Sequence, residues 1–167
     1  AASEMLQHAI GASQRILHNL RPAILEQGLV AAVQWLASDF ERRTSVRTTV
    51  HAASESVKLS KAIQLVAYRT TQEALTNISK HAEANAVMID LSDAEGVLTL
   101  EITDKGKGLD KTALDKPKTF GIRGLHERAK TVGGWLDVAS QPGVGTSIIL
   151  SVPLKPGLSD YHAEVTE

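Results

Sequence analysis

The chain has 167 residues, of which 43% are hydrophobic and only 4% aromatic, and its formal net charge at pH 7 is −1. This length suits one domain of ordinary size with a small extension, built on an aliphatic core. The near-neutral charge argues against a dedicated nucleic-acid-binding protein, which usually carries a basic surplus. The lack of cysteine excludes disulfides and thiolate metal sites, and it fits a cytoplasmic location.

The first part of the chain, residues 1–43, has the pattern of helices. Apolar residues follow helical spacing through 3–20 and again through 25–40, with Pro22 between the two segments. No apolar run is long enough to cross a bilayer, so we expect no membrane contact by this part of the protein. The abrupt start within a helical pattern suggests a longer parent protein.

The second part, residues 44–154, mixes strands and helices. We expect strands at 46–52, 86–95, 96–104, 135–140 and 146–154, helices at 58–82 and 121–132, and a loop at 105–120. The strands form antiparallel-looking pairs rather than alternating regularly with helices. This order predicts an α+β fold, a two-layer α/β sandwich with helices on one face of a mixed, mostly antiparallel sheet. The polar residues 155–167 are expected to form a flexible tail.

The glycine-rich stretch DKGKGLD at 104–110 does not match the familiar phosphate loops. A P-loop requires G-x-x-x-x-G-K-[ST], which occurs nowhere in the chain. A dinucleotide-binding fingerprint requires a third glycine where Lys111 stands, followed directly by a helix. Asp104 could instead accept a hydrogen bond from an exocyclic amine, and Gly106 and Gly108 would let a ring approach the backbone. An ordinary solvated turn would show the same residues.

The segment QEALTNISKHA places four polar side chains at helical spacing. Glu73, Asn77, Lys80 and His81 fall on roughly one helix face. A carboxylate, an amide oxygen and two possible cations suit hydrated Mg²⁺ with phosphates, because Mg²⁺ prefers oxygen ligands and keeps several waters. The spacing also fits an ordinary solvated helix face.

Two further glycine segments follow along the chain. Gly121 and Gly124 flank the start of a helix, where free N–H groups favour phosphate, although a plain capping turn would look the same. The segment 141–147, with Gly145 and Thr146, could bend so that its hydroxyl faces a ligand, or it could be a simple hairpin turn.

Taken in order, these four blocks resemble the N box and three glycine boxes of the GHKL ATP-binding superfamily, which has the Bergerat fold. That superfamily includes DNA gyrase, a heat-shock chaperone, mismatch-repair ATPases and histidine kinases. The resemblance covers residues 58–154. A second signal is HNLRPAILEQGLVAAVQWL at 18–36, which resembles the second dimerisation helix and the following segment of sensor histidine kinases related to the nitrate sensors. QEALTNISKHA and GIRGLHERAKTVGG are also typical of that subfamily.

The resemblance implies ATP and Mg²⁺ as cofactors and assigns roles around the phosphates. Asn77 would coordinate Mg²⁺, and Glu73 would order the water shell of the metal or assist the reaction. Lys80 and His81 would contact phosphate oxygens. Glu73, Asn77 and Lys80 are therefore the expected catalytic residues.

The resemblance also assigns the adenine side of the site. Asp104 would accept from the adenine amine, Gly106 and Gly108 would shape that wall, and Thr146 would help hold the base. Residues 109–120 would form an ATP lid. Further nucleotide contacts are expected at Gly121, Gly124, Leu125 and Gly145.

These features predict the catalytic core of a two-component histidine kinase. Residues 1–43 would be part of the dimerisation region, 44–154 the catalytic domain and 155–167 a tail. The phosphate acceptor is expected outside this sequence, because the only histidine followed by an acid is His126, which lies in the third block. A response regulator receiver domain and the phosphoacceptor helix would be partners, and the full-length protein would be a homodimer.

Two alternative functions stay open at the level of sequence. One is a GHKL ATPase or a kinase that acts on serine of a partner protein. The other is a non-catalytic interaction module with a degenerate site, in which the apolar stripe between Leu6 and Leu20 would be a docking face.

Overall fold

The structure, a computed structural model, describes residues 2–6, 21–53, 58–108 and 121–154. The predicted lid at 109–120, the tail at 155–167 and residues 7–20 of the first predicted helix lie outside the described residues. None of the described helices is both long enough and apolar enough to cross a membrane.

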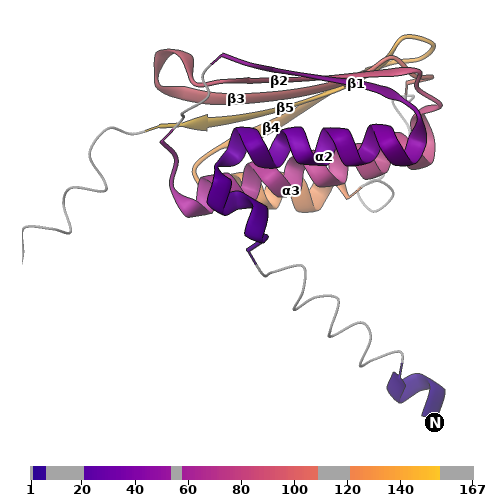
Figure 1. Cartoon of the computed structure of the whole chain (residues 1–167), viewed down its shortest axis with the longest axis horizontal. Coiled ribbons are helices and arrows are strands. Elements are labelled where there is room, and N and C mark those ends of the chain that lie inside the picture. The colour runs from indigo at the N-terminus through magenta and orange to yellow at the C-terminus, as the bar shows by residue number, and fades with distance from the viewer. Residues whose placement is uncertain (1, 7–20, 54–57, 109–120, 155–167) are drawn as a thin grey trace, which may run out of the picture.

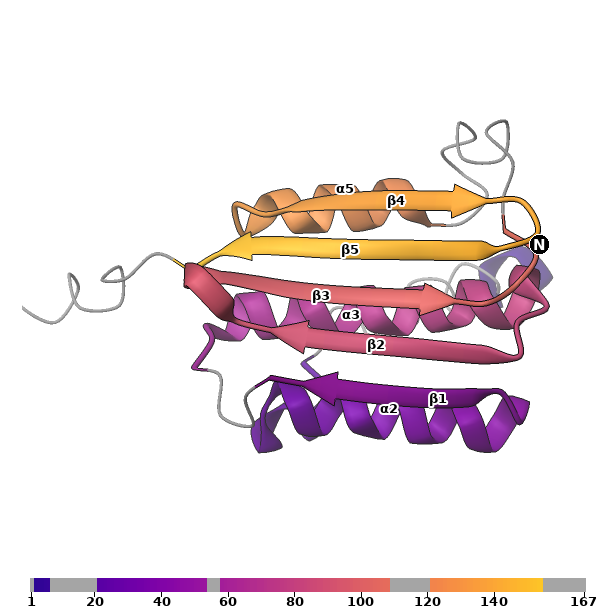
Figure 2. The ribbon, with the colours of Figure 1, turned by 90° about the horizontal axis from the view of Figure 1, so that it is seen from above.

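Five strands form one sheet with the order β1-β2-β3-β5-β4, and Figure 2 shows them side by side in front of the helices. The strands are β1 (Arg47–Ala52), β2 (Ala86–Ser92), β3 (Val97–Asp104), β4 (Trp135–Gln141) and β5 (Gly145–Pro153). β1 pairs with β2 in parallel, and the other three pairings are antiparallel. The sheet is therefore mixed and mostly antiparallel, as the strand pattern predicted.

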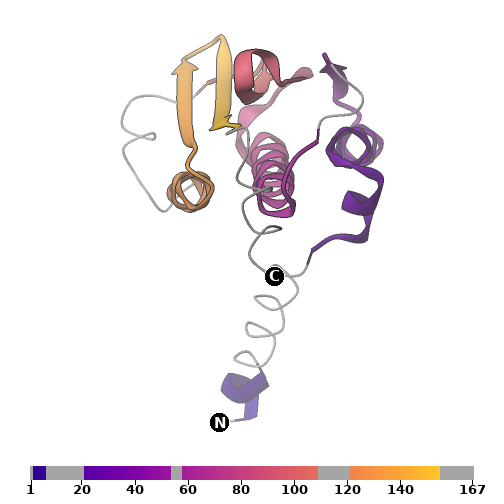
Figure 3. The same ribbon diagram turned by 90° about the vertical axis from the view of Figure 1, so that its left-hand side faces the viewer.

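From residue 21 onwards the helices lie on one face of this sheet, and the end-on view in Figure 3 shows the two layers. They are η1 (Ala23–Gln27), α2 (Leu29–Thr44), α3 (Lys61–Asn77) with the π-helical turn η2 (Ile78–Ala82), and α5 (Ile122–Thr131). A short 3-10 turn, η3 (Ala94–Gly96), joins β2 to β3. Figure 1 shows α2 and α3 running beneath the strands, so the predicted two-layer sandwich is confirmed.

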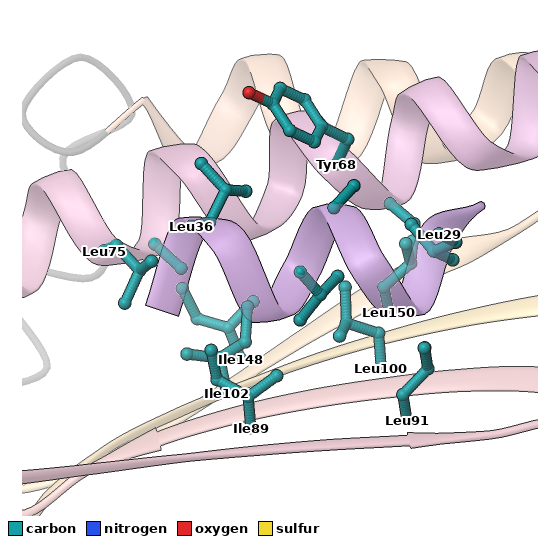
Figure 4. Close-up of a cluster of buried hydrophobic side chains, with 14 of the residues drawn as sticks. Leu29, Leu36, Tyr68, Leu75, Ile89, Leu91, Leu100, Ile102, Ile148 and Leu150 are labelled. Atoms are coloured by element: carbon teal, nitrogen blue, oxygen red, sulfur yellow. The ribbon is translucent and has the colours of Figure 1, made fainter. Parts of the chain in front are cut away.

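The core fills the space between the two layers. β3 alternates strictly between half-buried and buried residues, because successive side chains of a strand point to opposite faces. Figure 4 shows Ile89, Leu100 and Leu150 of the sheet packed beneath Leu36 and other helical side chains. The half-buried side chains of β3 point to the opposite face of the sheet.

The structure changes two predictions about the helices. α2 was expected to belong to an N-terminal unit ending at residue 43, yet its buried residues, Phe40 among them, share one core with the sheet. The long helix predicted at 58–82 is an α-helix only as far as Asn77 and continues as the π-helical turn. Glu83, in the left-handed conformation, ends that turn.

Candidate nucleotide-binding site

A pocket lies between the C-terminal end of α3 and the sheet, and the empty space there, open solvent included, is about 480 Å³. Its lining comes from α3, η2, β3, β4, β5, the loop after β3 and the first turn of α5: Ala74, Asn77, Ile78, His81, Ala82, Ile102, Asp104, Gly108, Ile122, Val138, Thr146 and Ile148. The wall is mostly apolar, with a few polar groups. A flat, largely apolar ligand with one or two hydrogen-bonding edges fits such a surface.

Asp104 is the buried polar group of this pocket, with only 4% of its surface exposed. It is the last residue of β3 and pairs with Thr146 of β5. Its Oδ1 accepts from the Gly106 N–H at 2.9 Å, and the Thr146 N–H also donates to its carboxylate. Burial raises the pKa of the Asp104 carboxyl, and these two backbone donors offset part of the rise. The carboxylate is thus held rigidly at the base of an apolar pocket.

The raised pKa of Asp104 predicts that nucleotide affinity falls on acidification, starting at a higher pH than an ordinary aspartate would give. An ionised carboxylate accepts hydrogen bonds with both oxygens, whereas the protonated acid has one oxygen occupied by its proton. Calorimetric titration with ADP between about pH 8 and pH 5 measures the effect. Asp104→Asn should show a flatter profile, and equal slopes for the two proteins would contradict the assignment.

Acidification should act on the free energy of unfolding in the opposite direction from its effect on nucleotide affinity. The native state holds this proton more tightly than the unfolded chain, so the contribution of Asp104 to the free energy of unfolding increases as pH falls through its native pKa towards the unfolded value. The difference between wild type and Asp104→Asn isolates this contribution from those of other carboxyls.

Asn77 and His81 form the wall opposite Asp104, and both line the pocket. Lys80 lies between them in sequence but is exposed and does not line the pocket. The reason is the π-helical turn, which changes the angular spacing on which a shared helix face depends. The structure thus brings Asn77 and His81 to the pocket and leaves Lys80 at the surface.

Gly106 and Gly108 are required by backbone packing rather than by the pocket alone. A Cβ on Gly106 would lie 2.2 Å from the carbonyl oxygen of Ala82, and one on Gly108 would lie 2.2 Å from that of Gln141. The same loop is hydrogen-bonded on both sides, from the Lys107 N–H to the Ala82 oxygen at 2.7 Å and from the Gly143 N–H to the Lys107 oxygen at 2.6 Å. The loop therefore joins the end of η2 to the β4–β5 turn.

The turn between β4 and β5 supports the pocket from its other side. Thr146 lines the pocket, and its hydroxyl lies 2.8 Å from that of Ser140. Gly145 does not line it, and a Cβ there would lie 2.0 Å from the carbonyl oxygen of Asp104. Gly145 therefore brings β5 against β3 rather than facing a ligand.

The segment from Gly121 to Leu125 lies partly in the core and partly at the surface. Leu125 is 2% exposed and belongs to the hydrophobic core, and its N–H donates to the Gly121 carbonyl at 3.1 Å. This corrects its expected role as a nucleotide contact, because both its side chain and its N–H are engaged within the protein. Gly124 has open space around its Cα, and Gly121 packs against Glu73.

Sequence reasoning missed the apolar residues of the pocket. Ile102 and Ile148 lie two positions from Asp104 and Thr146, on the same face of the sheet. Val138 of β4 and Ile122 of α5 complete the apolar wall. The spacing of two residues from Asp104 and from Thr146 could have indicated that Ile102 and Ile148 share their face of the sheet. Alternation in a strand predicts only that a side chain is buried, and it does not tell whether that side chain packs in the core or lines a pocket.

Fold and pocket together define a nucleotide-binding domain of the GHKL class. The profile of the family described as histidine kinase-, DNA gyrase B-, and HSP90-like ATPases matches residues 62–156. The chain belongs to this family.

Several relatives are named histidine kinases. The signal transduction histidine-protein kinase/phosphatase DegS of Brevibacillus brevis is 30% identical over 152 residues, which cover 90% of this chain and 39% of that protein. The sensor histidine kinase LiaS of Bacillus subtilis is 31% identical over 91% of this chain and 43% of its own. The oxygen sensor histidine kinase NreB of Staphylococcus carnosus is 32% identical over 81% of this chain and 39% of its own. The chain spans about two fifths of the length of these relatives.

Solved structures show the same fold. The blue-light activated histidine kinase of Erythrobacter litoralis superposes with a TM-score of 0.65 over 75% of this chain and 42% of its own, at 24% sequence identity. Its separate histidine kinase domain superposes with a TM-score of 0.63 at 23% identity, over 75% of this chain and 61% of its own.

Proposed function

We propose that this chain is the ATP-binding catalytic core of a two-component sensor histidine kinase, which transfers the γ-phosphate of ATP to a histidine for relay to an aspartate of a response regulator. The observation that carries the proposal is the buried Asp104 carboxylate in an apolar pocket whose opposite wall presents Asn77 and His81. The sensor kinases among the relatives support the choice of this class within the family.

Adenine would occupy the apolar pocket. Asp104 would accept from the exocyclic amine, while Ile102 and Ile148 would contact the ring. Thr146 would help hold the base through its hydroxyl, which Ser140 orients. A carboxylate can accept from adenine but cannot donate to the carbonyl that guanine carries at that position, so this arrangement selects adenine.

The phosphates would then extend past Asn77. This side chain is half-buried at the rim of the pocket, and Glu73 lies one helical turn before it on α3. An amide oxygen and a carboxylate at this spacing fit Mg²⁺, which prefers oxygen ligands and retains several waters. When bound, Mg²⁺ neutralises charge on the triphosphate as the phosphoryl group is transferred. Asn77 would hold the metal directly and Glu73 through water.

Cationic side chains would assist at the same end. His81 lines the pocket and can donate to a phosphate oxygen. Lys80 is exposed one residue earlier, and its long side chain would have to reach back over the rim to contact a bound nucleotide. Gly121 and Gly124, at the start of α5, would offer backbone N–H groups to the phosphates.

The partners follow from the class of enzyme. His126, the only histidine followed by an acid, lies within α5, so the acceptor histidine would come from a dimerisation helix outside this sequence. A receiver domain would accept the phosphate in turn. The full-length protein would act as a homodimer with this domain in the cytoplasm.

Asn77→Ala is expected to weaken Mg-ATP binding about tenfold, because it would remove the side chain that we propose to hold Mg²⁺ directly. The affinity for ADP in EDTA should change little, since Asp104 and the apolar wall remain. Isothermal titration calorimetry measures both values. Asn85→Ala, an exposed asparagine beyond η2, is the matched control. Unchanged Mg-ATP affinity in Asn77→Ala would refute the metal assignment.

A second experiment separates a histidine kinase from an ATPase of the same family. The chain is incubated with radiolabelled ATP and a dimerisation segment that bears the acceptor histidine. A labelled, acid-labile product on that segment supports the kinase. Sustained release of phosphate without transfer would favour the ATPase instead.

A further inference from the structure

Gly121 and Glu73 are in direct contact, although they lie on different elements. Gly121 is the N-cap of α5, and Glu73 lies on α3 one turn before Asn77. A Cβ on Gly121 would lie 2.4 Å from Glu73 Oε1, 2.9 Å from its Cδ and 3.3 Å from its Cγ. The side chain of Glu73 therefore lies across the space that any residue other than glycine would fill at position 121.

The conformation of Gly121 adds a second, separate requirement. Its φ is +64°, in the left-handed region that residues with a side chain rarely adopt. Conformation alone would therefore explain a glycine at this position. The same helix provides a comparison, because Gly133, just beyond its C-terminal end, has a φ of +73°, and a Cβ there would meet nothing within 4 Å. The two glycines share the backbone requirement and differ in the contact with Glu73.

Glu73 does not line the pocket. The residues that contact it from α5 therefore decide where its carboxylate lies. Glu73 and Asn77 are four residues apart on an α-helix and share a face. Any displacement of the Glu73 carboxylate away from α5 therefore alters the oxygen groups beside Asn77. Adenine binding would be unaffected, because its proposed contacts, Asp104 and Thr146, line the pocket and Glu73 does not.

We propose that Gly121 is a positioning residue for Glu73: its missing side chain gives the Glu73 carboxylate its place beside Asn77. This inference rests on the proposed function, since it assigns Glu73 to the magnesium and phosphate end of the site. It gives Gly121 a role that does not depend on contact with the nucleotide.

The contact is tested first on stability, without any ligand. Gly121→Ala and Gly133→Ala are compared by denaturant unfolding in the wild-type and Glu73→Ala backgrounds. Glu73 Oε1 ends a flexible side chain that can turn aside, so Gly121→Ala should lower the unfolding midpoint only slightly more than Gly133→Ala, and Glu73→Ala should abolish the excess. An excess that persists without Glu73 would overturn the proposal. If Gly121→Ala alone does not fold, recovery of folding in the double variant gives the same decision.

The consequence for the site is tested by ADP affinity with Mg²⁺ and with EDTA. Gly121→Ala should reduce the ratio of the affinity with Mg²⁺ to the affinity in EDTA by about threefold or more, because a loss through the phosphate contacts of its own N–H lowers both affinities and leaves this ratio unchanged. Gly133→Ala should leave both values unchanged. An equal loss in both conditions, or no loss, contradicts a role in placing Glu73. If wild type itself bound no nucleotide, the proposed function would fail, whereas the unfolding comparison would still decide the contact.

Discussion

Asp104→Asn is expected to weaken ATP binding by about tenfold to a hundredfold while leaving the protein no less stable at pH 7. The amide oxygen can still accept from the Gly106 N–H, so the loop after β3 should keep its place. The amide nitrogen, however, presents donors where the adenine amine also donates. Burial raises the pKa of Asp104, which means that the charged form destabilises the fold at neutral pH, and the neutral amide removes that cost.

The measurement pairs calorimetry with chemical denaturation on the same preparations. Asp137→Asn is the control, because Asp137 is an exposed carboxylate on β4 and lies outside the pocket. It should change neither quantity. A large loss of stability in Asp104→Asn would mean that the carboxylate serves the fold rather than ligand binding. Full retention of ATP affinity would remove Asp104 from the site.

Gly106→Ala is expected to lower the free energy of unfolding by about 2–3 kcal/mol and to impair nucleotide binding as well. Its φ is not in the left-handed region, so the cost comes from overlap rather than from backbone strain. The new Cβ would meet the Ala82 carbonyl at 2.2 Å and Asp104 Oδ1 at 2.8 Å. The first of these is backbone and cannot rotate away, so the loop must separate from η2.

Thermal and denaturant unfolding measure the loss of stability, and ADP titration measures the loss of binding. Gly124→Ala is the control for stability, since its Cβ would meet nothing within 4 Å and alanine favours a helix over glycine by up to about 1 kcal/mol. It should match or exceed the stability of wild type. A Gly106→Ala protein as stable as wild type would show that the loop and η2 can separate at no cost.

Much of the fold could be predicted from local patterns. The strict alternation in β3 and the helical spacing in α5 depend only on residues near one another in sequence. The strands predicted at 86–95 and 96–104 meet at Glu95 and Gly96, and in the turn between β2 and β3 both of these residues have positive φ. Hairpins join neighbours in the chain, so their pairing follows once the strands are known.

The errors arose where local patterns compete with long-range packing. The turn η2 follows an α-helix without a break in hydrophobic spacing, and its carbonyl at Ala82 is used by the N–H of Lys107, which lies more than twenty residues later. Leu125 was expected at the nucleotide because it belongs to a glycine-rich segment, but the helix turns its side chain into the core. The position of α2 in the core likewise depended on packing against a sheet whose strands follow it in the sequence.

The sequence by itself determined the elements, the order of the four blocks and the residue types available for binding ATP, because these depend on composition and on spacing along the chain. Only the tertiary structure decided which of those residues meet. It placed Asp104 against the backbone of Thr146, Gly106 against Ala82 and Gly121 against Glu73. Each of these contacts joins residues from different elements, and their separation in space is set by the packing of the helices on the sheet.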